Sequence, residues 1–228
     1  TDYTFHVGEK FFADGSPRSY PGSTIICFAD PTSLIYQAGE RLQNALKELP
    51  FGHKFGLLPP SSFHMTVFSL ICYDRKTTDE WSSRLAIDTP IGDTDQFFID
   101  ALKEVTPPSN FQMVVTYLGG WGLNFRLSPA NEATFSALRR FRRQVSEATG
   151  VRYPDHDTYE YHLTLAYLLQ TLTDEEYSAY QSFRESWGNQ LRCELGVFET
   201  GEPRLTFFED MFAFVPASER HLLPSRQA

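Results

Sequence analysis

The chain has 228 residues, of which 41% are hydrophobic and 21% are charged, a composition typical of a water-soluble globular protein with a sizeable core. Its formal net charge is −9. Proteins that hold long nucleic acids through many phosphates need a positive surface. The charge therefore argues against an extended nucleic-acid surface. It favours a small anionic substrate or the end of an RNA, and leaves the oligomeric state open.

The cysteines indicate a reducing environment. Cys27, Cys72 and Cys193 are odd in number and far apart, and no CxxC pattern occurs, so neither a disulfide framework nor a zinc site is predicted. We also find no charged-then-apolar leader and no apolar stretch long enough to span a bilayer. The expectation is a cytoplasmic protein without membrane association.

Apolar periodicity and turn residues divide the first half of the chain into alternating strands and helices. In chain order, they predict a buried strand over 22–30, an amphipathic helix over 34–49, a strongly apolar strand over 63–73, a helix starting at the capping-box pattern of 77–80, an interruption over 88–95, and a resumed helix over 96–105.

The second half shows the same kind of alternation. In chain order, it predicts a hairpin of strands 111–118 and 123–127 around a glycine-rich turn, a helix from an Asn131 cap to Thr149 closed by Gly150, a strand over 159–169, a helix from a capping box at 173–176 to about 188, strands over 191–199 and 204–215, and a frayed tail from Pro216.

The two halves resemble each other. Each carries a helix, a loop, an apolar strand that opens with histidine, and then Thr-Asp-Glu and a helix. This weak repeat predicts a duplicated α+β fold with two lobes, each an antiparallel sheet packed by helices, and an active-site cleft between them. We expect one domain over 1–228, with lobes at approximately 22–110 and 111–215 and possible strand exchange between them.

Two short motifs carry the chemistry. Residues 64–67 (HMTV) and 162–165 (HLTL) share the pattern histidine, apolar, threonine, apolar. Side chains alternate between the faces of a strand, so each motif places its histidine and threonine on one face and its apolar residues on the other. A single histidine of this kind is more often structural, whereas two matched copies indicate a functional pair.

Displacement at phosphorus explains why two histidines are useful. One group must take a proton from the attacking oxygen, and another must protonate the leaving oxygen. Imidazole titrates near pH ~6.5, so a neutral and a protonated copy are expected to coexist at working pH. The threonine hydroxyls are expected to hold the non-bridging phosphate oxygens. No metal or other cofactor is predicted.

The motifs resemble those of the two-histidine (2H) phosphoesterase superfamily, which includes cyclic nucleotide phosphodiesterases and bacterial RNA 2′,5′-ligase-like proteins. The resemblance also follows the order of elements over about 22–215. It implies that His64 and His162 act as general acid and base, in an order that it does not assign. It implies as well that Thr66 and Thr164 bind phosphate.

The resemblance implies a metal-independent phosphodiesterase that hydrolyses a cyclic phosphodiester, foremost a 2′,3′-cyclic one, on a nucleotide or in RNA processing at an RNA end. The chain departs from the pattern of many members, which have Pro before each histidine, where Phe63 and Tyr161 stand here. The alternatives are a non-catalytic protein that binds phosphate or RNA ends, an RNA end ligase with the same fold, and an unrelated α+β protein with structural histidines.

Three other features are weaker candidates. The 155–157 segment (DHD) suggests a metal site, but it follows a proline in a predicted loop. The four arginines within 139–143 are interpreted as a solvated helix face. Trp121, in the glycine-rich turn, could stack on a base or simply pack.

Overall fold

The computed structural model describes residues 2–226, and it confirms the predicted α+β class. Nine strands form one strongly curled sheet, in which every pairing is antiparallel and the order is β7-β4-β5-β6-β3-β1-β8-β9, with β2 beside β6. The strands are β1 Gly22–Phe28, β2 Phe55–Leu57, β3 His64–Cys72, β4 Gln112–Gly119, β5 Gly122–Pro129, β6 Tyr161–Leu168, β7 Val197–Glu199, β8 Arg204–Phe208 and β9 Phe214–Pro216. The helices are α1 His6–Glu9, α2 Leu34–Lys47, α3 Ile91–Ala101, α4 Glu132–Thr149 and α5 Asp174–Leu195.

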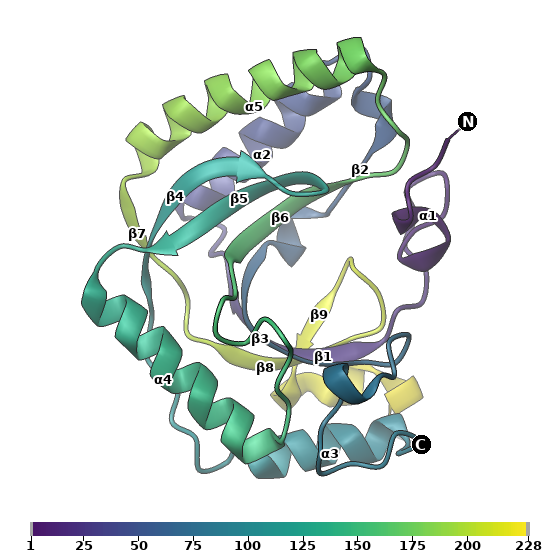
Figure 1. Ribbon diagram of the computed structural model, residues 1–228, viewed down its shortest axis with the longest axis vertical. Coiled ribbons are helices and arrows are strands. Elements are labelled where there is room, and N and C mark those ends of the chain that lie inside the picture. The colour runs from purple at the N-terminus through teal and green to yellow at the C-terminus, as the bar shows by residue number, and fades with distance from the viewer. Residues whose placement is uncertain (1, 227–228) are drawn as a thin grey trace.

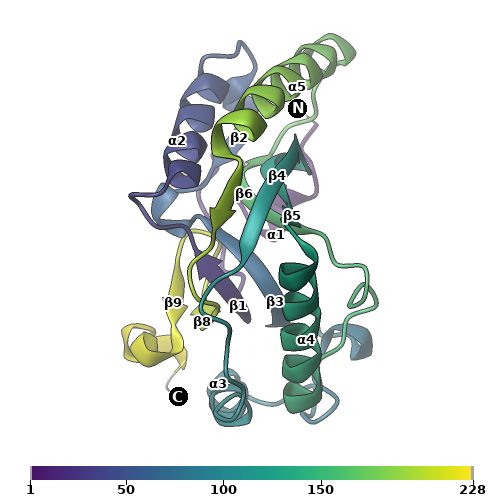
Figure 2. The ribbon, with the colours of Figure 1, turned by 90° about the vertical axis from the view of Figure 1, so that its left-hand side faces the viewer.

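Helices cover the curled sheet at both ends (Figure 1). α2 and α5 lie together over β4, β5 and β6, whereas α3 and α4 lie beside β1, β3 and β8 (Figure 2). The two parts of the sheet join where β3 meets β6. Since β8 and β9 extend the β1 edge and β2 pairs with β6, neither part is built from one continuous stretch of chain.

Local signals position the long helices as predicted. The side chain of Asn131 accepts a hydrogen bond from the backbone N–H three residues on, and α4 ends at Gly150 with a left-handed φ of 71°. Thr173 and Glu176 form the reciprocal capping box of α5. The side chain of Ser33 caps α2 by accepting a hydrogen bond from the backbone N–H of Tyr36, a cap that the sequence had not suggested.

Three predicted helix boundaries are wrong. Residues 78–80 form only a short 3₁₀ turn, because Trp81 continues in an extended conformation and packs its buried ring edge-on against Tyr73. α3 then begins at Ile91, inside the segment that was expected to interrupt it. α5 continues past position 188 to Leu195, so the strand predicted from 191 is reduced to β7. Leu191 and Leu195 are both buried and extend the apolar face of the helix.

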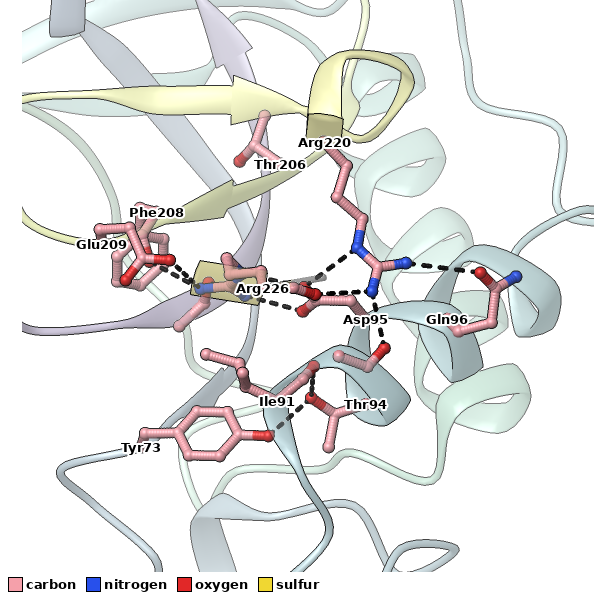
Figure 3. A network of polar contacts seen from close by, with 12 residues as sticks. Tyr73, Ile91, Thr94, Asp95, Gln96, Thr206, Phe208, Glu209, Arg220 and Arg226 are labelled. Atoms are coloured by element: carbon pink, nitrogen blue, oxygen red, sulfur yellow. Dashed lines mark hydrogen bonds and ion pairs between the residues drawn. The ribbon is translucent and has the colours of Figure 1, made fainter. Parts of the chain in front are cut away.

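The C-terminal tail is anchored and not frayed as predicted. Arg226 is fully buried, and its guanidinium donates to both carboxylate oxygens of Asp95 at 2.7 and 2.8 Å (Figure 3). It also donates to the carbonyls of Phe208 and Gly22, each at 2.9 Å. One side chain therefore ties α3, β8 and β1 together. Such an arrangement depends on residues far apart in sequence, so composition alone made the tail look exposed.

The N-terminal segment adds a second, smaller core. Phe11 and Tyr20 are buried together with Leu58, Leu169 and residues after β8, beside the end of β6. The main core lies between the sheet and the helices. Within residues 2–226, no helix is both long and apolar enough to cross a membrane.

Candidate active site

The two histidine motifs lie on neighbouring strands. β3 and β6 are in register at Met65 and Leu163, whose side chains are buried in the core. The histidines and threonines alternate with these apolar residues, are only partly buried, and share the opposite face of the sheet. They surround the central pair diagonally, with His64 and Thr164 at one end and Thr66 and His162 at the other. The structure thus brings all four predicted site residues together.

Both imidazoles are held by the same local contact. His64 Nδ1 lies 2.7 Å from the carbonyl oxygen of Ser62, and His162 Nδ1 lies 3.3 Å from that of Glu160. A carbonyl oxygen can only accept, so Nδ1 carries the proton and donates in each case. This arrangement leaves Nε2 as the nitrogen that can take up or release a proton.

Burial lowers the pKa of both histidines. It lowers the pKa of His64 to about 4, with a further contribution from the nearby His162. Burial also lowers the pKa of His162, and the positive charges of Arg126 and Lys10 lower it further. Both shifts favour the neutral imidazole in the free protein, whereas the sequence led us to expect one neutral and one protonated ring. A bound phosphodiester anion would raise both values.

The N-terminal segment supplies Lys10, which the sequence analysis missed. Its Nζ lies 5.2 Å from the ring centroid of Tyr20 and 5.3 Å from that of Tyr167 on β6. Within the part of the chain described, no carboxylate forms an ion pair with it. The positive charge of Lys10 lowers the pKa of His162. No sequence signal pointed to this lysine, because it lies in a segment without a recognisable motif, ahead of the first predicted strand.

Arg126 is a second missed residue. It is the direct cross-strand partner of His162, on β5, so both side chains lie on the same face. Its guanidinium contacts Glu160 at 3.3 Å, and its buried Nε has no hydrogen-bond partner among residues 2–226. A charged residue between the apolar Phe125 and Leu127 of a predicted strand was the signal that could have revealed it.

A cavity of about 580 Å³ opens beside His162, between β4 and β5 on one side and α4 and the 152–161 loop on the other. Glu160 and Tyr161, which directly precede His162, line it, whereas none of the four predicted site residues does. Six arginines line the cavity: Arg126, Arg139, Arg140, Arg142, Arg143 and Arg152.

This cavity changes the interpretation of the arginine cluster as a solvated face, which is wrong for Arg142. Arg142 is buried and donates to the carbonyls of Val67 and His156 at 2.6 and 2.9 Å, so it joins α4 to β3 and the loop. The other three arginines of the cluster are exposed, but they line the cavity.

The remaining candidates are engaged elsewhere. Asp157 pairs with Arg152 at 2.6 Å, and the carbonyl of His156 accepts from Arg142. Across residues 2–226, no three His, Cys, Asp or Glu side chains are grouped so that they could hold a metal ion. Burial raises the pKa of the Cys27 thiol to about 12, which makes it a poor nucleophile. Trp121 is 72% exposed and packs edge-on against Phe5, at 5.7 Å between ring centroids.

Comparisons with known proteins identify a matching family and a similar structure. Residues 10–123, half of the chain, match the family described as "2H-phosphodiest: Domain of unknown function (DUF1868)". A crystal structure of a conserved protein of unknown function from Agrobacterium tumefaciens is similar, with a TM-score of 0.87 and 29% sequence identity over 95% of this chain and 92% of that chain. No curated protein matches.

Proposed function

The chain belongs to the 2H-phosphodiest family of domains of unknown function (DUF1868), and we propose that it is a metal-independent phosphodiesterase that opens a 2′,3′-cyclic phosphodiester on a nucleotide or at an RNA end. The observation that carries the proposal is the matched pair of imidazoles on β3 and β6. Each ring is held through Nδ1 by a backbone carbonyl and keeps Nε2 available for proton transfer.

In the proposed reaction, the neutral imidazole of His64 takes a proton from water while the water oxygen attacks phosphorus. The bond from phosphorus to one ribose oxygen breaks, and the imidazolium of His162 protonates that leaving oxygen. The product is a phosphomonoester with a free neighbouring hydroxyl. His64 is assigned as the base because its pKa is lowered to about 4, so it stays neutral when substrate binds. His162 then takes up the proton that the anionic substrate favours.

We propose that four side chains hold the phosphate. Thr66 and Thr164 each lie on the same face as the histidine of their own motif, where a hydroxyl can donate to a non-bridging oxygen. Lys10 and Arg126 bring positive charge to His162. These charges lower the pKa of the imidazole in the free protein and are neutralised by the substrate anion. Substrate binding and the protonation of His162 are therefore coupled.

The test is a panel of 2′,3′-cyclic and 3′,5′-cyclic mononucleotides, cyclic dinucleotides and RNA ends, incubated with pure protein in excess EDTA and followed by phosphorus NMR. We expect ring opening of the 2′,3′-cyclic substrates that chelator does not abolish. Binding without turnover of any substrate would overturn the proposal in favour of a binding protein, and joined RNA products would overturn it in favour of a ligase. Loss of turnover in EDTA, restored by zinc or manganese, would instead implicate a metal.

A further inference from the structure

The cavity beside His162 has the size and the chemistry of a ligand site. Its volume of about 580 Å³ lies within the range of pockets that enclose small ligands, roughly 300–1,000 Å³. Six arginines and three carboxylates, Glu132, Asp157 and Glu160, line it, so its formal charge is 6 − 3 = +3. The chain as a whole carries −9. Positive charge is thus concentrated in this cavity, although the net charge of the chain is negative.

Three of these arginines contribute no ion pair to the fold of residues 2–226. Arg139, Arg140 and Arg143 form no ion pair within the described chain. Arg139 and Arg143 are four residues apart on α4, where like charges repel. The folded protein therefore holds unneutralised positive charge at the wall of a cavity. An anion with several charges would relieve this repulsion.

Aromatic side chains accompany the arginines. Phe135 on α4 is 43% exposed and Tyr117 on β4 is 52% exposed, and both line the cavity. The guanidinium of Arg139 lies 5.6 Å from the ring centroid of Phe135. Exposed rings between cationic side chains are the surface on which the bases of a single strand stack while its phosphates meet the charges.

The cavity adjoins the proposed active site through residues next to His162. Glu160 and Tyr161, which line it, directly precede His162, and Arg126, which also lines it, is the cross-strand partner of His162. A chain that ends at the two histidines can therefore extend into the cavity.

We propose that this cavity binds the sugar-phosphate backbone and bases of single-stranded RNA adjacent to the reacting end, so that the substrate is an oligonucleotide and not a mononucleotide. The inference rests on the proposed function for the reaction itself, but the binding can be measured without it. A terminal 2′,3′-cyclic phosphate has its neighbouring nucleotides on the 5′ side. Those nucleotides are the ones placed in the cavity.

Binding is tested by fluorescence anisotropy with a 5′-labelled hexanucleotide that ends in a 3′-phosphate and is not turned over. The test variant, called the cavity variant, combines Arg139→Gln, Arg140→Gln and Arg143→Gln. Its control is Arg41→Gln with Lys47→Gln and Arg192→Gln, which removes the same charge from the exposed faces of α2 and α5. We expect the cavity variant to weaken binding at least about tenfold. The slope of log K against log salt should fall by about 2 units, since each single-strand contact contributes roughly 0.7. Equal Kd values for the two triple variants would overturn the inference.

Two further arms identify the ligand. Phe135→Ala should weaken binding of the hexanucleotide but leave displacement by inorganic tripolyphosphate unchanged. If tripolyphosphate binds as tightly as the hexanucleotide, the site is a general polyanion site and the inference is wrong.

Measurements of turnover distinguish a failure of the RNA-binding inference from a failure of the proposed phosphodiesterase function. An RNA hexamer with a 2′,3′-cyclic end should have a kcat/KM at least tenfold above that of the 2′,3′-cyclic mononucleotide, and only the cavity variant should lose this advantage. Equal kcat/KM for both substrates would overturn the inference and leave the phosphodiesterase intact. Cavity-dependent binding without hydrolysis of either substrate would overturn the phosphodiesterase and leave the RNA site intact.

Discussion

Arg126 lies directly opposite His162 on the neighbouring strand, and its charge lowers the pKa of that imidazole. Arg126→Gln removes this charge, so the pKa of His162 is expected to rise, which NMR titration of its ring protons would show. With His162 as the acid, the alkaline limb of kcat/KM moves to higher pH. Loss of a charged hydrogen bond to phosphate should also lower kcat/KM roughly 10–100-fold.

Arg126→Lys is the matched control because it keeps the charge but not the guanidinium. The pKa of His162 should then return toward the wild-type value, while kcat/KM recovers only in part. An unchanged His162 titration in Arg126→Gln would show that the arginine acts on something other than the imidazole.

The two histidines should be individually necessary. His64→Ala and His162→Ala are each expected to lower kcat/KM by roughly 10²–10⁴, because each removes one positioned proton transfer. The double variant should lose less than the product of the single effects, since both groups serve one step. His53→Ala, at an exposed position outside the site, is the control. Wild-type turnover in either folded single variant would make that histidine structural.

The threonines should act on the transition state. Thr66→Ala and Thr164→Ala are each expected to reduce transition-state stabilisation by about 1–3 kcal/mol, the effect of losing a hydrogen bond to a charged group. Thr→Ser at each position retains the hydroxyl and should restore most of kcat/KM. If serine is no better than alanine, the methyl group matters and the hydroxyl does not bind phosphate.

Stability should fall in acid. Burial lowers the pKa of His6 and of His64 to about 4 in the folded protein, whereas an unfolded histidine titrates near ~6.5. Between these values the unfolded state binds more protons, so the free energy of unfolding rises with pH and is lost as the pH falls from about 6.5 to about 4. Each histidine contributes at most about 3 kcal/mol.

Urea unfolding across that pH range measures this effect. His6→Leu removes one titrating group and should flatten the pH dependence, because His6 packs between Phe5 and Tyr167 without a role in the proposed reaction. An equally steep dependence in His6→Leu would mean that His6 does not titrate as described.

The buried ion pair between Asp95 and Arg226 should be essential to the C-terminal anchor. Asp95→Asn and Arg226→Met are each expected to lower the free energy of unfolding by about 3–5 kcal/mol, because each leaves a buried charge without its partner. Combining the two should cost less than their sum. Arg41→Met, which breaks an exposed pair with Glu194, should cost less than about 1 kcal/mol. Similar losses from the buried and exposed variants would contradict the role of Arg226.

Local patterns in the sequence determined much of the fold and the core of the site. Alternation around 64–67 and 162–165 correctly predicted the strands, and Asn131, Gly150 and the Thr173 capping box correctly delimited two helices. These features depend on neighbours within a few residues, so the backbone geometry of one element is enough to express them. The α+β class followed from the order of the elements.

Only the tertiary structure decided what surrounds the histidines. The single register position at Met65 and Leu163 joins the two motifs. Packing between distant segments brings Lys10 and Arg126 close enough to lower the pKa of His162, and Arg126 also lines the arginine-rich cavity. The same holds for Arg226, whose burial reversed the expectation of a frayed tail. Contacts of this kind depend on strand register and packing between distant segments. No local period in the amino-acid sequence records them. The motifs of His64 and His162 could therefore be recognised from the sequence, whereas the proximity of Lys10 and Arg126 to His162 could not.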